Sequence, residues 1–285
     1  MGAGQSRIIL PRRSALLGGA ASLIPLFRPA SLAATPPAPE ATATPPEAAA
    51  APPAATGAAP AERATPQRVD LLFCGDSLAQ GMFLTLHPAL RRRETLRIIN
   101  GTLHATGVTR GDEYDWTVAS RDLVARHQPH LVVFWIGAND FRPLVVRALR
   151  ARHAFGSAGF AQLYRERVAE MVTNAVQGGA RAIWLGLPNM REAQFAGAVR
   201  QLNAIQQAAA EGAGALFLPT WDATSDEQGR YMPAVALERA THSLRAEDGV
   251  HFTHFGYRRI GAMLFDAAAE HFPELAPCLG RFGEA

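Results

Sequence analysis

The sequence contains no lysine, and all 28 of its basic residues are arginine. This absence excludes the classes whose chemistry needs a lysine amine: Walker-type phosphate loops, Schiff-base enzymes, protein kinases and Ser-x-x-Lys hydrolases. Only two cysteines are present, Cys74 and Cys278, which are too few for a disulfide framework. Because Cys74 lies in an apolar stretch, we expect it to be a small core residue without a bridge to Cys278.

Two further absences narrow the function. No Gly-x-Gly-x-x-Gly pattern follows the first apolar stretch, so a dinucleotide site is not expected. The formal net charge is only +3, and residues 1–33 carry four arginines and no acidic residue. The rest of the chain is therefore close to neutral and lacks the basic patch that nucleic-acid binding requires.

Residues 1–34 have the layout of a bacterial export signal. Arg12 and Arg13 precede a short apolar segment over 15–27, and Ser31-Leu32-Ala33-Ala34, a cleavage site with small residues at 31, 33 and 34, follows it. Paired arginines before a mildly hydrophobic segment favour the twin-arginine route, by which a protein crosses already folded. We therefore expect a periplasmic or extracellular protein with no membrane span in the mature chain. The alternative is an N-terminal segment that stays uncleaved as an anchor.

Residues 35–66 consist almost entirely of Ala, Pro, Thr and Glu. Such a composition cannot bury enough apolar surface to fold, so we expect a disordered linker, either a tether or a spacer without a role. From residue 67 the pattern becomes globular, which predicts one domain over 67–285.

This domain alternates short apolar runs with segments of helical periodicity. The expected strands are Arg68–Cys74, Leu96–Asn100, Leu131–Ile136, Arg181–Leu187 and Ala215–Leu218, and the expected helices are Leu78–Arg92, Tyr114–His127, Ala158–Gln177, Glu192–Glu211 and His254–His271. Several strands are apolar throughout, which indicates burial on both faces. The alternation predicts a three-layer α/β/α sandwich around a mainly parallel sheet.

Polar residues follow two of these apolar runs and precede the last helix. They stand in Gly75-Asp76-Ser77, in Gly137-Ala138-Asn139-Asp140 and in the segment from Asp248 to His251. In an open α/β sheet the carboxyl ends of the strands meet at one edge, so these side chains should converge. A serine, an imidazole, a carboxylate and amide donors are the groups that acyl transfer needs. A structural alternative is that Ser77 only caps the helix that it begins.

These blocks resemble those of the SGNH, or GDSL, hydrolase superfamily, over essentially all of residues 67–285. The matching motifs are Gly75-Asp76-Ser77-Leu78, a loop glycine, Gly137-x-Asn139-Asp140 and Asp248-x-x-His251. The fold that this resemblance implies is flavodoxin-like, with five parallel strands. Ala79 stands where ordinary α/β-hydrolases have a second glycine, which argues against that other fold.

The resemblance also implies a role for each matching residue. Ser77 would be the nucleophile, His251 its general base and Asp248 the carboxylate that orients the base. The oxyanion hole would comprise the Ser77 N–H, the Gly107 N–H and the side-chain amide of Asn139. Gly101 is the alternative to Gly107, because it directly follows the second predicted strand.

Several neighbouring residues have a structural alternative. Asp76 and Asp140 suit turns and caps, and Trp135 and Trp184 suit the core. An Asp248/His251/His254 metal site is conceivable, but we favour His254 as the start of the last helix. Arg110, Phe141 and Arg142 suit either the substrate or the rim, and the stretch 141–155 suits a lid, a substrate wall or a solvated basic loop.

Taken with the export signal, the resemblance implies a serine esterase that needs no metal or cofactor. Its expected substrates are small acyl esters, above all acetyl groups on an envelope carbohydrate. Two alternatives remain: a glycan O-acetyltransferase with the same triad, and a non-catalytic glycan-binding or assembly factor.

Overall fold

The computed structural model of the protein describes residues 65–146, 150–237 and 240–283. The predicted export signal over 1–34 and all but the last two residues of the predicted linker over 35–66 lie outside the described residues. Within the described part, the chain from residue 69 onward forms the α/β domain that the sequence predicts.

The central sheet has five parallel strands in the order β2-β1-β3-β6-β7. They are β1 (Val69–Gly75), β2 (Leu96–Thr102), β3 (Leu131–Trp135), β6 (Arg181–Leu185) and β7 (Leu216–Leu218). This order is the flavodoxin-like one, and it confirms the predicted fold class. The order reverses between β1 and β3, and the carboxyl ends of these two strands are where such folds bind ligands.

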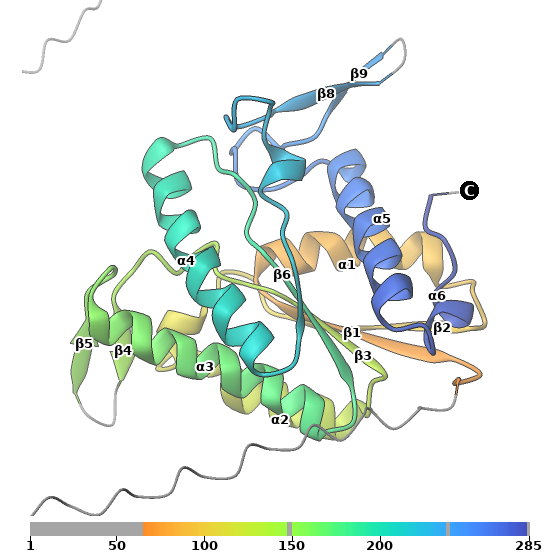
Figure 1. Ribbon diagram of the computed structural model, residues 1–285, viewed down its shortest axis with the longest axis horizontal. Coiled ribbons are helices and arrows are strands. Elements are labelled where there is room, and N and C mark those ends of the chain that lie inside the picture. The colour runs from red at the N-terminus through yellow and green to blue at the C-terminus, as the bar shows by residue number, and fades with distance from the viewer. Residues whose placement is uncertain (1–64, 147–149, 238–239, 284–285) are drawn as a thin grey trace, which may run out of the picture. The chain divides into compact units, whose positions relative to one another are not determined.

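Helices cover both faces of the sheet (Figure 1). One face carries α1 (Ser77–Leu90) packed against α5 (His254–His271), with the short α6 (Ala276–Leu279) beside α5. The other carries α2 (Trp116–His127), α3 (Ala158–Gln177) and α4 (Ala193–Gly212), each packed on the next. All five long helices were predicted, and α3 and α5 have the predicted bounds.

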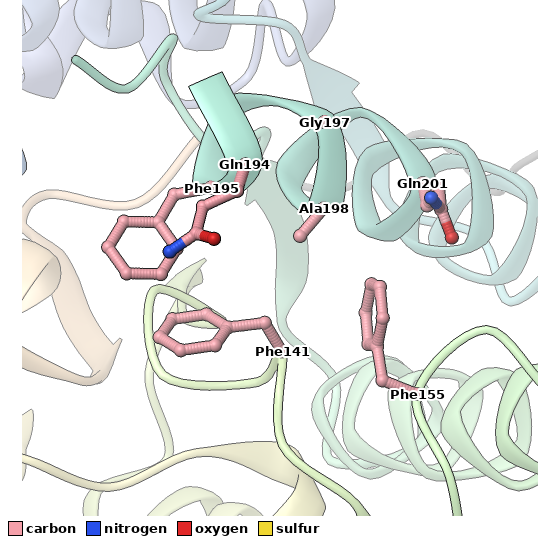
Figure 2. Close-up of a pocket in the computed structure, with 7 residues that line it drawn as sticks. All are labelled: Phe141, Phe155, Gln194, Phe195, Gly197, Ala198 and Gln201. Carbon is pink, nitrogen blue, oxygen red and sulfur yellow. The ribbon is translucent and has the colours of Figure 1, made fainter. Parts of the chain in front are cut away.

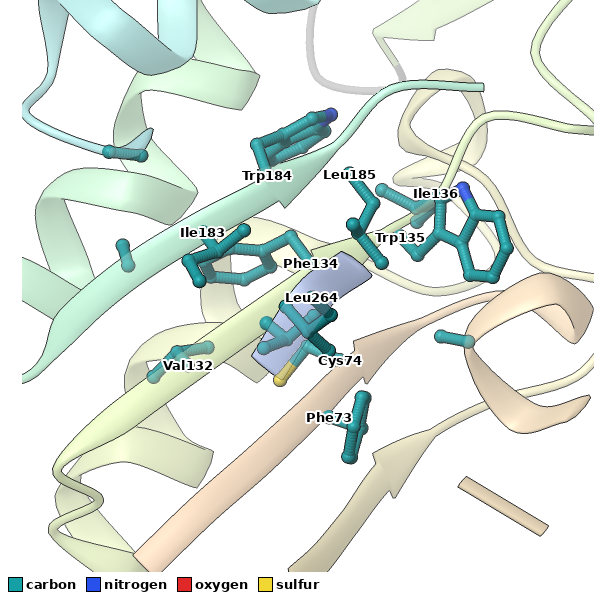
Figure 3. Close-up of a cluster of buried hydrophobic side chains, with 14 of the residues drawn as sticks. Phe73, Cys74, Val132, Phe134, Trp135, Ile136, Ile183, Trp184, Leu185 and Leu264 are labelled. Atoms are coloured by element: carbon teal, nitrogen blue, oxygen red, sulfur yellow. The ribbon is translucent and has the colours of Figure 1, made fainter. Parts of the chain in front are cut away.

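The middle of the sheet forms the core of the domain. Every residue of β1 and β3 is buried, as their continuous apolar sequences predict. Figure 3 shows side chains of β1, β3 and β6 gathered with Leu264 of α5. The expectation that Trp135 and Trp184 are core residues is confirmed, because both are fully buried and Trp184 stacks on Phe134.

Two small hairpins lie outside the central sheet and were not predicted. One pairs β4 (Leu144–Val146) with β5 (Ala151–His153), and the other pairs β8 (Ala234–Leu237) with β9 (Ala240–Ser243). Strands of three or four residues are too short to show a periodicity that distinguishes them from loops. Two 3₁₀ turns complete the described elements, η1 (Val108–Arg110) and η3 (Asp222–Thr224).

Cys74 and Cys278 are both buried and free. Among the described helices, none combines the length and the apolar character that a membrane crossing requires.

Candidate active site

Ser77 is the first residue of α1 and follows the sharp turn that ends β1. Gly75 has φ +143°, and a Cβ there would lie 2.0 Å from the carbonyl oxygen of Trp135 in β3. Only glycine therefore allows the two strands to approach this closely. The turn delivers the Ser77 hydroxyl to the carboxyl edge of the sheet, where the first N–H groups of α1 have no partner within the helix.

Asp76 fixes this turn to the loop that follows β3. One carboxylate oxygen accepts a hydrogen bond from the Leu78 N–H (2.9 Å), and the other accepts from the Gly137 and Ala138 N–H groups (2.9 and 3.0 Å). The predicted capping role is confirmed. Burial raises the pKa of Asp76 to about 6, although these hydrogen bonds oppose the shift.

His251 and Asp248 lie next to Ser77 in a continuous chain of hydrogen bonds. His251 Nε2 is 2.7 Å from the Ser77 hydroxyl oxygen, and His251 Nδ1 is 2.6 Å from the Asp248 carboxylate. The structure therefore brings together three residues that the sequence places at 77, 248 and 251. This is the arrangement by which an imidazole removes a proton from a hydroxyl.

The Asp248 carboxylate is held ionised. Partial burial raises its pKa, but hydrogen bonds from the His251 ring and from the His251 and Val250 N–H groups outweigh this and lower the pKa to about 2. An acceptor-only carboxylate fixes which ring nitrogen of His251 carries the proton. Nε2 is then the nitrogen that can accept the Ser77 proton.

A buried arginine supports the segment that carries Asp248 and His251. Arg245 is only 4% exposed, and its guanidinium donates to the carbonyl oxygens of Asn189 (2.6 Å), Val250 (2.7 Å) and His251 (3.3 Å). It also lies 4.3 Å from the ring centroid of Phe252. Burial lowers the pKa of Arg245 to about 10, so it remains charged at neutral pH. These contacts fix the backbone on both sides of the imidazole.

Asn139 lies in the loop after β3, and one of its side-chain N–H groups donates to the Thr106 carbonyl (2.9 Å). The Asn139 amide thereby contacts the residue that precedes Gly107. Gly107 itself is buried and is not among the residues that line the pocket of Ser77. Gly101 lies within β2, paired with Cys74, and not in a loop.

Asp140 fixes the loop around Gly107 through hydrogen bonds to the residues that follow it. Its buried carboxylate accepts hydrogen bonds from the N–H groups of Val108 and Thr109, the Thr109 hydroxyl and the Tyr164 hydroxyl, at 2.8 to 3.1 Å. Burial raises its pKa, opposed by these hydrogen bonds. Asp140 therefore caps the 3₁₀ turn η1 and is not among the residues that line the pocket of Ser77, in line with its expected structural role.

The candidate site opens into a pocket of about 200 Å³, which we call the serine pocket. Its polar residues are Ser77, Asn139, Asp248 and His251, so four of the five predicted site residues line one cavity. The rest of its wall is apolar and comprises Ala138, Phe141, Met190, Phe195, Val199 and Val250. A small apolar pocket beside a few convergent polar groups suits a small ligand with one reactive polar centre.

Figure 2 shows a second hollow, which we call the phenylalanine hollow. Its lining residues are Phe141, Phe155, Gln194, Phe195, Gly197, Ala198 and Gln201. Phe141 and Phe195 line both cavities and stack on each other with ring centroids 4.6 Å apart. This stacked pair forms the partition between them. Of the stretch 141–155, Phe141 forms part of the wall of the serine pocket, and Phe155 lines only the phenylalanine hollow.

Other candidates have structural partners. Arg110 pairs with Asp112 and Glu113 at the surface, and His254 begins α5 as expected. Within the described residues, no group of three or more His, Cys, Asp or Glu side chains is placed to hold a metal ion.

Sequence reasoning missed the support by Arg245 and the apolar wall that α4 contributes. A buried arginine has no local signature that separates it from a solvated one. Phe195 and Val199 stand four residues apart on α4, a spacing that indicates a helical face but not what the face covers.

Solved structures with this fold include hydrolases of the SGNH, or GDSL, type. A GDSL-like lipase from Bacteroides thetaiotaomicron is 21% identical, with 74% of this chain and 93% of that chain covered and a TM-score of 0.50. An α/β hydrolase enzyme from the metagenome of Lake Arreo, Spain, is 18% identical, with 74% and 96% covered and a TM-score of 0.51. At these identities the likeness establishes the SGNH hydrolase fold.

The family follows from the sequence profile. Residues 70–267 match the family described as "Protein of unknown function (DUF459)", and the chain belongs to this family. None of the curated proteins matches the sequence.

Proposed function

We propose that this protein is a serine esterase that hydrolyses small acyl esters. The observation that carries the proposal is the hydrogen-bonded chain from the Ser77 hydroxyl through the His251 ring to the Asp248 carboxylate. Its location at the carboxyl edge of an SGNH hydrolase fold, inside a pocket with an amide donor, supports the proposal. Because all three residues of this hydrogen-bonded series are present and aligned, a catalytic function is favoured over glycan binding alone.

The reaction proceeds in two steps. His251 Nε2 takes the Ser77 proton while the oxygen attacks the ester carbonyl carbon, and the negative charge moves to the carbonyl oxygen. The proposed donors to this oxyanion are the N–H groups of Ser77 and Gly107 and the amide of Asn139. The intermediate collapses, and the alcohol departs with the proton from His251. Water, activated by the same ring, then attacks the acyl-enzyme and releases the acid.

The acyl group we propose is acetyl or another short chain. The serine pocket is about 200 Å³, below the size of a typical drug-sized site, and its wall is apolar. A carbohydrate as the alcohol portion is supported by the predicted export of the chain and by its resemblance to this hydrolase superfamily. A transferase would use the same residues and replace water by a sugar hydroxyl in the second step.

The test is covalent labelling with a serine-reactive fluorophosphonate, combined with turnover of a chromogenic acetyl ester. We expect the wild type to be labelled and active, and Ser77→Ala to lose both signals. Ser157→Ala is the matched control, because its hydroxyl caps α3 and lies outside the serine pocket. Labelling that survives Ser77→Ala contradicts the proposed nucleophile. Adding a sugar acceptor and analysing the products distinguishes hydrolysis from transfer.

Export by the twin-arginine route is tested separately. Replacing Arg12 and Arg13 together by lysine keeps the charge but removes the arginine pair that this route requires. We expect the full chain to move from the periplasmic or extracellular fraction to the cytoplasmic one. An unchanged distribution contradicts this route.

A further inference from the structure

A third cavity, the arginine hollow, adjoins the serine pocket. Its volume is about 330 Å³, within the range of small-ligand sites. Met190 lines both the arginine hollow and the serine pocket, so the two cavities share a wall. The functional side chains of its lining are Arg191, Arg200, Trp221, Arg230 and Tyr231.

Two of the three arginines are available for an anion. Arg230 is engaged, because it donates to the Asp226 carboxylate (2.8 Å) and to the side-chain oxygen of Gln228 (3.0 Å). Arg191 and Arg200 make no ion pair with any carboxylate in the described part of the chain, and both are exposed. A guanidinium offers paired N–H donors whose geometry matches a carboxylate or a phosphate.

The aromatic residues give the hollow a flat apolar surface. The Arg200 guanidinium lies 4.6 Å from the ring centroid of Trp221, and this contact restricts where its charge can point. Trp221 is half-buried, so part of its ring faces the cavity. An aromatic face beside hydrogen-bond donors suits a sugar ring, which presents apolar C–H groups on one side and polar groups at its edge.

The hollow is tied to the segment that carries the catalytic base. The Asn189 side chain donates to the Ser225 hydroxyl (2.9 Å) and the Gly229 carbonyl (3.2 Å). These hydrogen bonds join the two segments that line the hollow, 189–200 and 221–231. Arg245, which holds the His251 carbonyl, also donates to the Asn189 carbonyl and lies 5.1 Å from the Tyr231 ring centroid. A group bound in the hollow would therefore stand at a fixed position relative to Ser77.

We propose that the arginine hollow binds an anionic sugar unit in the alcohol portion of the ester. The carboxylate or phosphate of this unit contacts Arg191 and Arg200, and its ring lies against the part of Trp221 that the Arg200 guanidinium leaves uncovered. This inference rests on the proposed esterase function, because it names the substrate class of that same site.

Binding can be measured without any hydrolysis. Trp116, Trp135 and Trp184 are fully or almost fully buried, so acrylamide quenching of the full chain reports mainly on Trp221. We expect glucuronate or glucose 6-phosphate to protect the fluorescence in a saturable way at millimolar concentration, and glucose to have no effect. Arg200→Gln should remove the protection, and Trp221→Phe should remove the quenchable signal. Protection by glucuronate alone identifies a carboxylate site, and protection by glucose 6-phosphate alone identifies a phosphate site.

The second measurement compares two acetyl esters, an acetylated glucuronoside and its neutral amide. We expect kcat/KM to favour the charged ester by about tenfold at low salt. The ratio should approach one in Arg191→Gln and in Arg200→Gln, and fall in the wild type as salt is added. Arg165→Gln is the matched control, because Arg165 is exposed on α3 and lies outside this cavity.

The outcomes separate the two proposals. Absence of saturable protection by both anions, or equal protection by glucose, overturns the anionic site whatever the enzyme activity. Protection that persists in Arg200→Gln also overturns it. A wild type that hydrolyses neither ester contradicts the proposed function, and the quenching measurement then decides alone whether the hollow binds an anionic sugar.

Discussion

The carboxylate of Asp140 occupies the space that a side chain at residue 107 would need. A Cβ on Gly107 would lie 2.2 Å from the nearer Asp140 carboxylate oxygen, which is itself hydrogen-bonded to the following turn. We therefore expect Gly107→Ala to destabilise the fold by about 1–3 kcal/mol, measured by urea unfolding.

Gly212→Ala is the control for this substitution. Gly212 is the last residue of α4, and an added Cβ there meets no atom within 4 Å. Alanine should be neutral or stabilising there by up to about 1 kcal/mol. If Gly107→Ala proves as stable as the wild type, the Asp140 carboxylate does not confine this loop.

Asn139→Ala should reduce kcat for ester hydrolysis by about 10²–10³-fold and leave KM nearly unchanged, because the proposed donor acts on charge that develops in the transition state. Steady-state kinetics on an acetyl ester measure this. Asn174→Ala is the control, because Asn174 joins α2 to α3 through Thr117 and Ser120 and lies outside the serine pocket. A kcat of Asn139→Ala within about threefold of the wild type would exclude an oxyanion role for this amide.

Arg245→Ala should lower kcat by about 10–100-fold, because the carbonyls beside His251 lose their donor and the imidazole is no longer held. Unfolding free energy should fall by about 3 kcal/mol or more, since buried carbonyls are left unpaired. Added guanidinium at millimolar concentration should restore part of the activity by occupying the vacated space. Full activity of the variant without guanidinium would argue against a positioning role.

The buried carboxyl of Asp76 gives the fold a pH dependence. Its pKa is about 6 in the folded state, above the usual value near 4, so as pH rises through this window the unfolded chain loses the proton first. The contribution of this group to stability is therefore greatest below pH 4 and falls between about pH 4 and pH 6.

Asp76→Asn removes this titration. We expect the wild type minus variant difference in unfolding free energy to fall by about 2–3 kcal/mol from pH 4 to pH 7, measured by urea unfolding at each pH. Asp122→Asn, at an exposed position on α2, should show no such trend. A difference that stays constant or grows with pH contradicts the assignment.

Phe141→Ala should widen the range of acyl groups accepted, because it removes half of the stacked partition between the serine pocket and the phenylalanine hollow. The ratio of kcat/KM for hexanoate to that for acetate should rise by about tenfold or more, since each buried methylene is worth about 0.8 kcal/mol. Phe155→Ala is the control, because Phe155 lines only the phenylalanine hollow. An equal rise in both variants would show that the partition does not limit chain length.

The fold was predictable because its strands and helices carry strong local patterns. The apolar runs at β1, β3 and β6 need no tertiary information to be recognised, and the residues after each run then fall at one edge of the sheet. The position of Ser77 follows from the same rule, whereas Asp248 and His251 follow none of these runs and were found by their motif just before the last helix. Their hydrogen bonds require the folded chain, because α5 must pack against α1 before residue 251 can reach residue 77.

The walls of the site could not be predicted in the same way. Whether Phe195 faces the serine pocket depends on how α4 is rotated against α3, which is a property of packing. Arg200 stands only five residues further along the same helix and lines a different cavity. The sequence indicates which residues belong to α4, but the three cavities around it exist only in the folded protein.

His251 and Asp248 are only three residues apart on one turn, whereas Ser77 is 174 residues from His251 in the sequence. The geometry of His251 relative to Asp248 thus depends on one short turn. The alignment of both with Ser77 depends on the packing of the whole domain. Mild heating or denaturant should first separate the turn from the N-terminus of α1. The hydrogen bond between His251 and Ser77 would then be lost while the hydrogen bond between His251 and Asp248 remains. Loss of activity would then precede loss of the sheet.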